Sequence, residues 1–139
     1  MSSGEDKITS WFASQSDAPA ELFPIGIGDD MAQVAADSGS ILITTDMLLD
    51  GTHFTLSEAG YEHAGYKAMA ASLSDCAAMA TIPVCAVAAV ALPPETSSEA
   101  LRELHSGLKR AGDMFQCYLI GGDITAWNDE GRFAINVTM

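Results

Sequence analysis

Three apolar runs in this chain end alike, in small or hydroxyl residues followed directly by aspartate. They are Ile25-Gly-Ile-Gly-Asp-Asp30, Ile41-Leu-Ile-Thr-Thr-Asp46 and Tyr118-Leu-Ile-Gly-Gly-Asp123. Glycine lets the backbone adopt unusual angles and come close to a ligand. A single Gly-Asp pair is most often no more than a turn, but three such endings predict a set of strand-end carboxylates that hold a common ligand.

Hydrophobic periodicity predicts the secondary structure. Helices are predicted over residues 5–15, 61–81 and 96–111, and the last opens with the capping pattern Thr96-Ser-Ser-Glu99. Strands are predicted over 41–45, 84–91, 116–120 and 132–138, with a short strand at 31–36 and a turn at 37–39. The run 84–91 is apolar throughout, so we expect it at the centre of the sheet and covered on both faces.

The predicted helix over 61–81 is rich in alanine and carries Asp75 among its small residues. A buried carboxylate is costly unless a cation or hydrogen-bond donors meet it. The pattern leaves two interpretations open. Asp75 is either an exposed or turn-capping residue, or it belongs to a functional site.

The chain is strongly acidic. Asp and Glu outnumber Lys and Arg by 19 to 6 in 139 residues, and the net charge is -13. Such a chain repels nucleic acid and anionic membranes, so we expect neither as a partner. If its ligand is also an anion, a metal cation must stand between the two. Solubility alone is the other explanation of the charge.

Localisation is predicted from the termini, the apolar runs and the cysteines. No signal-peptide pattern opens the sequence, and the longest apolar run, residues 82–92, is too short to span a bilayer. Cys76, Cys85 and Cys117 lie far apart without a Cys-x-x-Cys pair. This spacing favours buried thiols in a reducing compartment over disulfides or zinc. We therefore expect a cytoplasmic protein.

Five aspartates and two threonines are candidates for one oxygen-rich site: Asp29, Asp30, Asp46, Asp75 and Asp123, with Thr44 and Thr45. Carboxylates that converge destabilise a fold unless a cation joins them. Oxygen ligands without His or Cys suit Mg²⁺ or Ca²⁺, and Mg²⁺ commonly shares its shell with phosphates. The spacing is not that of an EF-hand, and neither a P-loop nor a complete dinucleotide-binding motif occurs. The residues therefore predict a nucleotide-phosphate site with Mg²⁺.

Four stretches, taken in order, resemble the thiamine-monophosphate kinase family, whose superfamily includes aminoimidazole ribonucleotide synthetase and selenophosphate synthetase. They are Gly26-Ile-Gly-Asp-Asp30, Thr44-Thr-Asp46 with Asp50-Gly-Thr-His-Phe54, Lys67-Ala-Met-Ala-Ala-Ser-Leu-Ser-Asp75-Cys-Ala-Ala-Met79, and Leu119-Ile-Gly-Gly-Asp-Ile-Thr125. The resemblance implies an α+β fold in which helices cover one face of a four-stranded mixed sheet, and the sheet pairs across a homodimer. It also implies transfer of the ATP γ-phosphoryl group to thiamine monophosphate, giving thiamine diphosphate, with several Mg²⁺ ions.

The resemblance further implies roles for single residues. The metal ligands would be Asp30, Thr44, Thr45, Asp46, Asp75 and Asp123. The ATP contacts would be Gly122, Asp123 and His105, which stands where some relatives carry a tyrosine near the adenine. His53 would contact thiamine monophosphate, and Gly26, Gly28 and Asp29 would support the site. Without the surrounding motif, His53 reads as an ordinary loop histidine.

The resemblance runs from about residue 25 to residue 139, and the family's enzymes are longer than this chain. We therefore expect residues 1–24 to form an N-terminal helix and lead-in, and residues 25–139 to form the ATP- and Mg²⁺-binding N-terminal domain, with the C-terminal domain absent from this chain. We expect the chain alone to dimerise but to be inactive or nearly so. Two alternatives stay open: a related ATP-using synthetase, against which the Asp-Gly-x-His-Phe element argues, and a non-catalytic dimerisation or metal-binding module.

Overall fold

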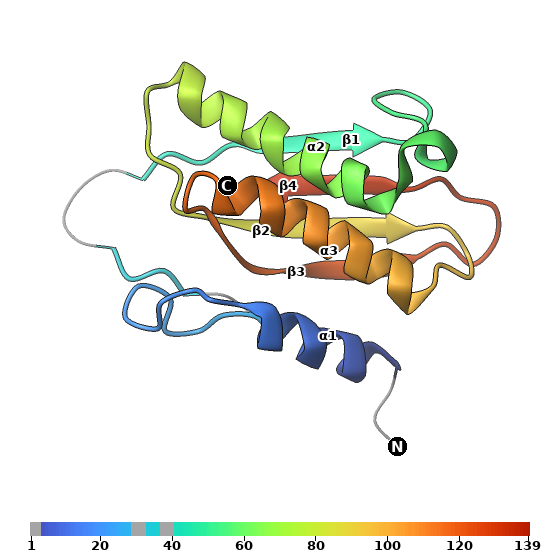
Figure 1. The fold of residues 1–139 in the computed structure, drawn as a ribbon, viewed down its shortest axis with the longest axis horizontal. Coiled ribbons are helices and arrows are strands. Elements are labelled where there is room, and N and C mark those ends of the chain that lie inside the picture. The colour runs from blue at the N-terminus through green and yellow to red at the C-terminus, as the bar shows by residue number, and fades with distance from the viewer. Residues whose placement is uncertain (1–3, 29–32, 37–40) are drawn as a thin grey trace.

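A computed structural model describes residues 4–28, 33–36 and 41–139 of the chain. Seven elements form within these ranges (Figure 1): α1 (Gly4–Gln15), β1 (Thr45–Leu49), α2 (Leu56–Ala78), β2 (Cys85–Leu92), α3 (Ser98–Asp113), β3 (Tyr118–Ala126) and β4 (Ala134–Thr138). None of the helices in the described ranges is both long and apolar enough to cross a membrane.

The four strands form one mixed sheet in the order β1-β4-β2-β3. Strand β4 pairs antiparallel with β1 and with β2, whereas β2 and β3 are parallel. Helices α2 and α3 lie side by side across one face, and α1 lies beyond the β3 edge (Figure 1). The predicted α+β fold, with a mixed four-stranded sheet and helices on one face, is confirmed.

The core lies between the sheet and the helix pair. The predicted apolar stripe of α3 is buried there: Leu101, Leu104, Leu108 and Ala111. Helices α2 and α3 approach so closely that a Cβ at Gly65 or Gly107 would collide with a carbonyl oxygen of the other helix. Close helix packing therefore explains the buried small residues of α2, among them Ala64, Gly65 and Ala68.

The first strand is displaced from its predicted position. The prediction was residues 41–45, but β1 runs from Thr45 to Leu49. Register explains the error, because Thr44 exchanges two backbone hydrogen bonds of 3.0 Å with Met139 and Thr45 pairs with Thr138. Residues 41–43 lie outside this pairing and are exposed, despite their β-branched and apolar character.

The strand ends also differ from the prediction. The predicted strand 116–120 is replaced by β3, which continues through Gly122 and Asp123 to Ala126. Asp46 is the second residue of β1, not a residue beyond its end. The interpretation of Asp46 and Asp123 as strand-end carboxylates is therefore wrong, because pairing with β4 and β2 extends both strands past them.

The predicted strand 84–91 is confirmed as the inner strand β2, but its expected cover on both faces is wrong. Ala89 is exposed, since α2 and α3 cover the other face. The predicted helix over 61–81 begins earlier, at Leu56, and is interrupted by a non-helical Gly60 (φ 77°). Of the predicted strand 31–36, residues 33–36 contribute one bridge, between Ile25 and Gln33; residues 31–32 and most of the predicted turn 37–39 lie outside the described ranges.

Candidate functional site

A cavity of about 690 Å³ lies between α1, α3 and the β3 edge of the sheet. Four residues that the sequence singled out line it: Gly28, His105, Gly122 and Asp123. They come from a loop, a helix and a strand that are far apart in the sequence. Asp29 and Asp30 follow Gly28 directly but lie outside the described residues. The structure thus brings the predicted ATP contacts to one cavity.

Glycine at two of these positions has a structural reason. Gly28 has a φ of 117°, which residues with a Cβ rarely adopt. A Cβ at Gly122 would collide with the carbonyl oxygen of Ala88 on the paired strand. Both positions therefore present bare backbone to the cavity, which is the property expected where a chain cradles a polar ligand.

His105 lies in the wall of the cavity rather than on the surface, with only 6% of its area exposed. Its ring stacks on Phe12 at a centroid distance of 4.9 Å and meets the edge of Trp11 at 5.4 Å. Burial lowers the pKa of this imidazole from its ordinary value, and nearby Lys109 acts in the same direction, opposed by Asp113. His105 is therefore an uncharged ring of which Phe12 already covers one face.

A second group of polar residues lies at the other edge of the sheet, where β1 meets α2. The Thr44 hydroxyl donates to Oδ2 of Asp75 at 2.6 Å. The fully buried Ser72 contacts Oδ2 of Asp46 at 3.3 Å and the Val137 carbonyl oxygen at 3.4 Å. Asp75 is thus neither exposed nor a helix cap, and sequence reasoning missed Ser72, whose only sequence signal is a position one turn before Asp75.

Thr45 is separated from Thr44 and Asp46 because successive residues of a strand face opposite sides of the sheet. Its hydroxyl lies 3.2 Å from Oδ1 of Asn136 and 3.0 Å from the hydroxyl of Thr138, on the face without helices. Asn136 also donates to the Asp46 carbonyl oxygen at 3.1 Å. The predicted metal ligands Thr44 and Thr45 therefore belong to different faces.

The two groups stand on opposite edges of the sheet. Pairing runs from Asp46 to Val137, from Val137 to Ala88 and from Ala88 to Gly122. Three strand spacings separate Asp46 from Gly122, which amounts to about 14 Å between backbones. Within the described residues, no three His, Cys, Asp or Glu side chains lie where they could share a metal ion. The donors are nevertheless carboxylate and hydroxyl oxygens, the kind that Mg²⁺ prefers.

His53 lies in the turn after β1, as predicted, and is exposed. Its Nδ1 accepts a hydrogen bond from the Leu49 N–H at 2.9 Å, and its carbonyl oxygen accepts one from Nζ of Lys67. The neutral ring must therefore carry its proton on Nε2, which stays available as a donor. Asp50 fixes the same turn, because its Oδ1 accepts from the N–H of Leu56 at 2.8 Å. That contact spans six residues, so no local capping pattern could have predicted it.

Comparison with known proteins identifies the family to which this chain belongs. The family model described as "AIR synthase related protein, N-terminal domain" matches residues 28–139. The chain belongs to this family. Thiamine-monophosphate kinase of Rhodopirellula baltica is 35% identical over 123 residues, covering 83% of this chain and 38% of the relative. The chain therefore spans well under half the length of that relative.

Two solved structures extend the likeness. The thiamine-monophosphate kinase of Stenotrophomonas maltophilia shares 31% identity and a TM-score of 0.74, covering 96% of this chain and 39% of that one. A structure named AaThiL, complexed with AMPPCP and TMP, shares 30% identity and a TM-score of 0.66 over 96% of this chain and 39% of its own. The AIR synthase related chain is therefore similar in sequence and fold to one part of these kinases.

Proposed function

We propose that this chain is the N-terminal part of an enzyme that transfers the γ-phosphoryl group of ATP to thiamine monophosphate, giving thiamine diphosphate. The observation that carries the proposal is the cavity that gathers Gly28, His105, Gly122 and Asp123. Its volume suits a ligand the size of a nucleotide. The relatives named above supply the reaction, and one of the similar structures was solved with AMPPCP and TMP.

ATP lies, in this proposal, in the cavity beside α1. Gly122 and Asp123 contact its phosphates, since Gly122 leaves the backbone open to the cavity. His105 belongs to the wall near the base. Because Phe12 covers one face of its ring, His105 contributes apolar surface and shape rather than a charge.

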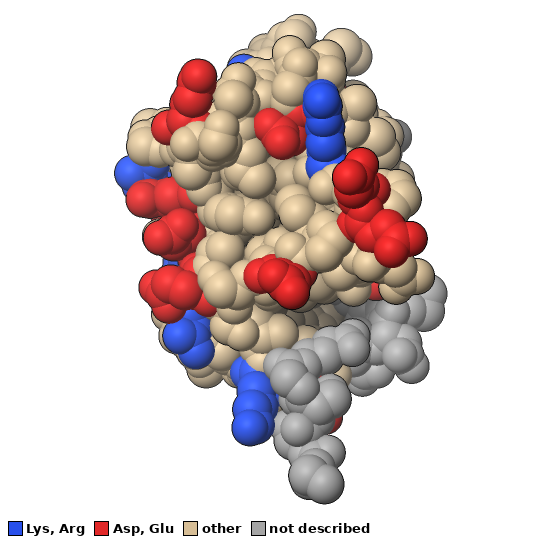
Figure 2. Space-filling model, turned by 90° about the vertical axis from the view of Figure 1, so that its right-hand side faces the viewer, with Lys and Arg blue, Asp and Glu red and all other residues tan. Residues whose placement is uncertain are grey.

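The metal ligands proposed here are Asp30, Thr44, Thr45, Asp46, Asp75 and Asp123, with Gly26, Gly28 and Asp29 shaping the loop beside them. Bound Mg²⁺ would neutralise the charge of the two phosphate groups and align them. The acceptor phosphate oxygen is already ionised at neutral pH, so the chain needs no strong general base. Acidic side chains are spread over the face shown in Figure 2, with fewer basic ones between them, which accords with a need for cations when a polyanion binds.

We also propose that the chain forms a homodimer through the sheet face that carries no helix. Met47 and Leu49 of β1 are 59% and 39% exposed on that face, and Ala89 of β2 is exposed on the other side of Asn136 of β4. An uncovered apolar sheet face is typical of an interface. His53, at the far end of β1 from Thr44, would contact thiamine monophosphate. A cytoplasmic location is proposed on the three free cysteines.

A non-catalytic module is the second candidate. It is favoured by the short span of the chain relative to the kinases and by the separation of the two polar groups in a single copy. Under either proposal the chain alone turns over little or no thiamine monophosphate. Full turnover by the purified chain would contradict both the fragment interpretation and the second candidate.

The test of the nucleotide and metal site is a melting experiment with Mg²⁺ and AMPPCP. Ligands that bind only the folded state raise the melting temperature, so the wild-type chain should melt higher with both ligands present. The Asp46→Asn/Asp75→Asn variant should lose most of that rise, and the matched control is Asp129→Asn/Glu130→Gln, which removes two exposed carboxylates outside the site. No rise in the wild type, or an equal rise in the Asp46/Asp75 variant, would count against the proposal.

A further inference from the structure

Helix α1 has two functional faces. Ile8, Trp11 and Phe12 pack against the body of the domain. Asp6, Thr9, Ser10 and Ala13, which share one side of the helix at spacings of one, three and four residues, line the 690 Å³ cavity, and Phe12 borders it as well. A helix face with this spacing is continuous, and three of its four residues are polar. The cavity therefore has one wall, α1, that is joined to the sheet only through packing and a few polar contacts.

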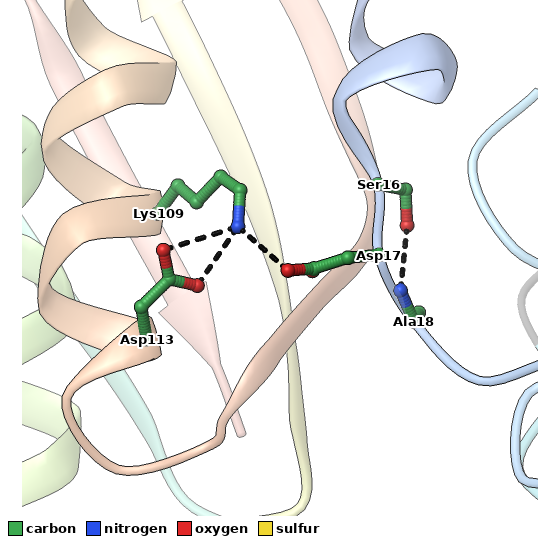
Figure 3. Close-up of polar contacts among 5 residues, drawn as sticks. All are labelled: Ser16, Asp17, Ala18, Lys109 and Asp113. Atoms are coloured by element: carbon green, nitrogen blue, oxygen red, sulfur yellow. Dashed lines mark hydrogen bonds and ion pairs between the residues drawn. The ribbon is translucent and has the colours of Figure 1, made fainter.

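Trp11 of α1 meets His105 and Arg102 of α3, and two further contacts fasten this wall to α3. The first is the stack of Phe12 on His105. The second follows the end of α1, where Nζ of Lys109 lies 3.1 Å from Oδ2 of Asp17 (Figure 3). Asp113, one turn further along α3, holds the same ammonium group at 2.9 and 3.1 Å. Lys109 is thus positioned by its own helix to reach the segment that follows α1.

The two other cations of α3 make their ion pairs elsewhere, although the Arg102 guanidinium also lies 5.5 Å from the centre of the Trp11 ring on α1. Arg102 pairs with Glu99 inside α3, and Arg110 pairs with Glu62 on α2. Lys109 and Arg110 are therefore adjacent cations on one helix, each with a carboxylate on a different element. This arrangement provides a matched control for the role of Lys109.

We infer that α1 is the closing wall of the cavity and that Lys109 is a positioning residue that determines how tightly a nucleotide binds without touching it. The inference rests on the proposed nucleotide site. A nucleotide in the cavity meets the Thr9 and Ser10 face only while α1 is docked. Its apparent affinity is then reduced by the fraction of molecules in which α1 is undocked. Loosening the Lys109–Asp17 contact lowers the docked fraction.

The experiment uses Trp11 as a reporter of α1. The chain has two tryptophans, and the second, Trp127, is half exposed in the loop before β4, where its Nε1 donates to the Arg132 carbonyl oxygen. A Trp127→Phe background therefore leaves Trp11 as the sole tryptophan signal. Acrylamide quenching measures how well α1 is docked, and calorimetric titration with Mg²⁺-AMPPCP measures affinity.

Lys109→Met should increase the quenching of Trp11 and weaken AMPPCP binding by up to about three-fold, since loss of the exposed contact with Asp17 shifts the docking equilibrium by no more than that factor. Arg110→Met, which removes the contact to Glu62, should leave both readouts unchanged. Lys109→Met loses its ion pairs with Asp17 and Asp113, and Arg110→Met loses its ion pair with Glu62 and its place over the Tyr66 ring. Because these are surface contacts, the two variants should melt within a few degrees of each other. The charge swap Asp17→Lys/Lys109→Glu, combined with Asp113→Lys so that position 109 keeps an oppositely charged neighbour on α3, should restore docking and affinity toward the wild-type values, an outcome that a merely structural lysine would not give.

The outcomes separate the inference from the proposed function. A wild-type chain that binds no AMPPCP overturns both. If the wild-type chain binds AMPPCP and the two variants Lys109→Met and Arg110→Met weaken binding equally, or not at all, the inference that α1 closes the cavity is wrong. The proposed nucleotide site would then still hold. A selective loss in Lys109→Met without rescue by the charge swap also overturns the role given to the Lys109–Asp17 contact.

Discussion

The two groups of candidate site residues lie at opposite edges of the same sheet, one at β3 and the other at β1. The two edges differ in the chemical groups that they present. At the β3 edge, bare backbone and aromatic rings surround an open cavity. At the β1 edge, hydroxyl groups already hold the carboxylates of Asp46 and Asp75. The first edge borders an open cavity, whereas the carboxylates of the second already accept hydrogen bonds from hydroxyl groups. The cavity and the carboxylate group therefore depend on separate structural supports, which substitutions at each edge should distinguish.

The largest effect is expected at the β3 edge. Gly122→Ala places a Cβ against the carbonyl oxygen of Ala88, so β2 and β3 must move apart. We expect a loss of about 3 kcal/mol in the free energy of unfolding, the upper range for overpacking, measured by urea denaturation. Gly26→Ala is the control, because a Cβ there meets no atom within 4 Å. Equal stability of the two variants would show that the cavity does not depend on close strand pairing.

At the β1 edge, Ser72→Ala removes the hydroxyl that contacts Asp46 and the Val137 carbonyl oxygen inside the core. We expect the free energy of unfolding to fall by about 1–2 kcal/mol, since a buried polar group loses its partner. Urea denaturation without added metal provides the measurement. Ser74→Ala, two residues along α2 and exposed, should change stability little. If Ser72→Ala leaves the free energy of unfolding unchanged, Asp46 does not need the Ser72 hydroxyl to hold it in place.

The docking of α1 at the β3 edge should depend on pH through His105. Burial lowers the pKa of His105 below its ordinary value of 6.5, so the unfolded chain binds the proton more readily than the folded one. The contribution of the buried, uncharged His105 ring to the docking of α1 is fully present above pH 6.5. It decreases as the pH falls below that value. Quenching of Trp11 by acrylamide, followed from pH 7.5 to 5, should therefore increase on acidification. His105→Gln should flatten this profile, and an unchanged profile would assign the titration to another group.

The smallest effect is expected on the uncovered face of β1. Thr45→Val removes exposed hydroxyl contacts with Asn136 and Thr138 and keeps a β-branched side chain in the strand. We expect a change in the free energy of unfolding of about 0.5 kcal/mol or less, because water replaces exposed hydrogen bonds. Thr44→Val should cost more, since Asp75 then loses its donor at 2.6 Å. The opposite order in urea denaturation would reverse the assignment of the two faces.

Local signals in the sequence predicted part of this structure well. The helix predicted over 5–15 is α1. A capped start of α3 is also found, but the cap is Ser97, whose hydroxyl accepts from the Ala100 N–H at 3.1 Å, and not the predicted Thr96, whose hydroxyl donates to the Pro93 carbonyl oxygen. Helical periodicity and capping act within a few residues, so they can be read from the chain directly. The motif resemblance likewise identified the family and the residues that meet at the cavity, whereas the metal ligands remain predictions.

The pairing of strands that lie far apart in the chain could not be predicted from local sequence patterns. The apolar run at residues 41–43 predicts a strand as strongly as any other, yet the partner strand pairs with Thr44 and the residues after it. Gly121 and Gly122 look like the end of a strand, yet pairing with β2 carries β3 through them. A strand is defined by its partner, and the partner lies more than thirty residues away in both cases.

By itself, the sequence determined the helices, the central apolar strand and the set of residues to consider, because periodicity, caps and motifs are local properties. Only the tertiary structure decided that Phe12 and Trp11 enclose His105 from more than ninety positions away. It alone decided that Thr44 and Thr45 face opposite sides of the sheet, and that Asp46 and Asp123 stand on opposite edges of it. Strand register and helix docking determine which of these residues share a face, an edge or a contact. Both depend on contacts between segments that are far apart in the chain, and local sequence patterns do not reveal such contacts.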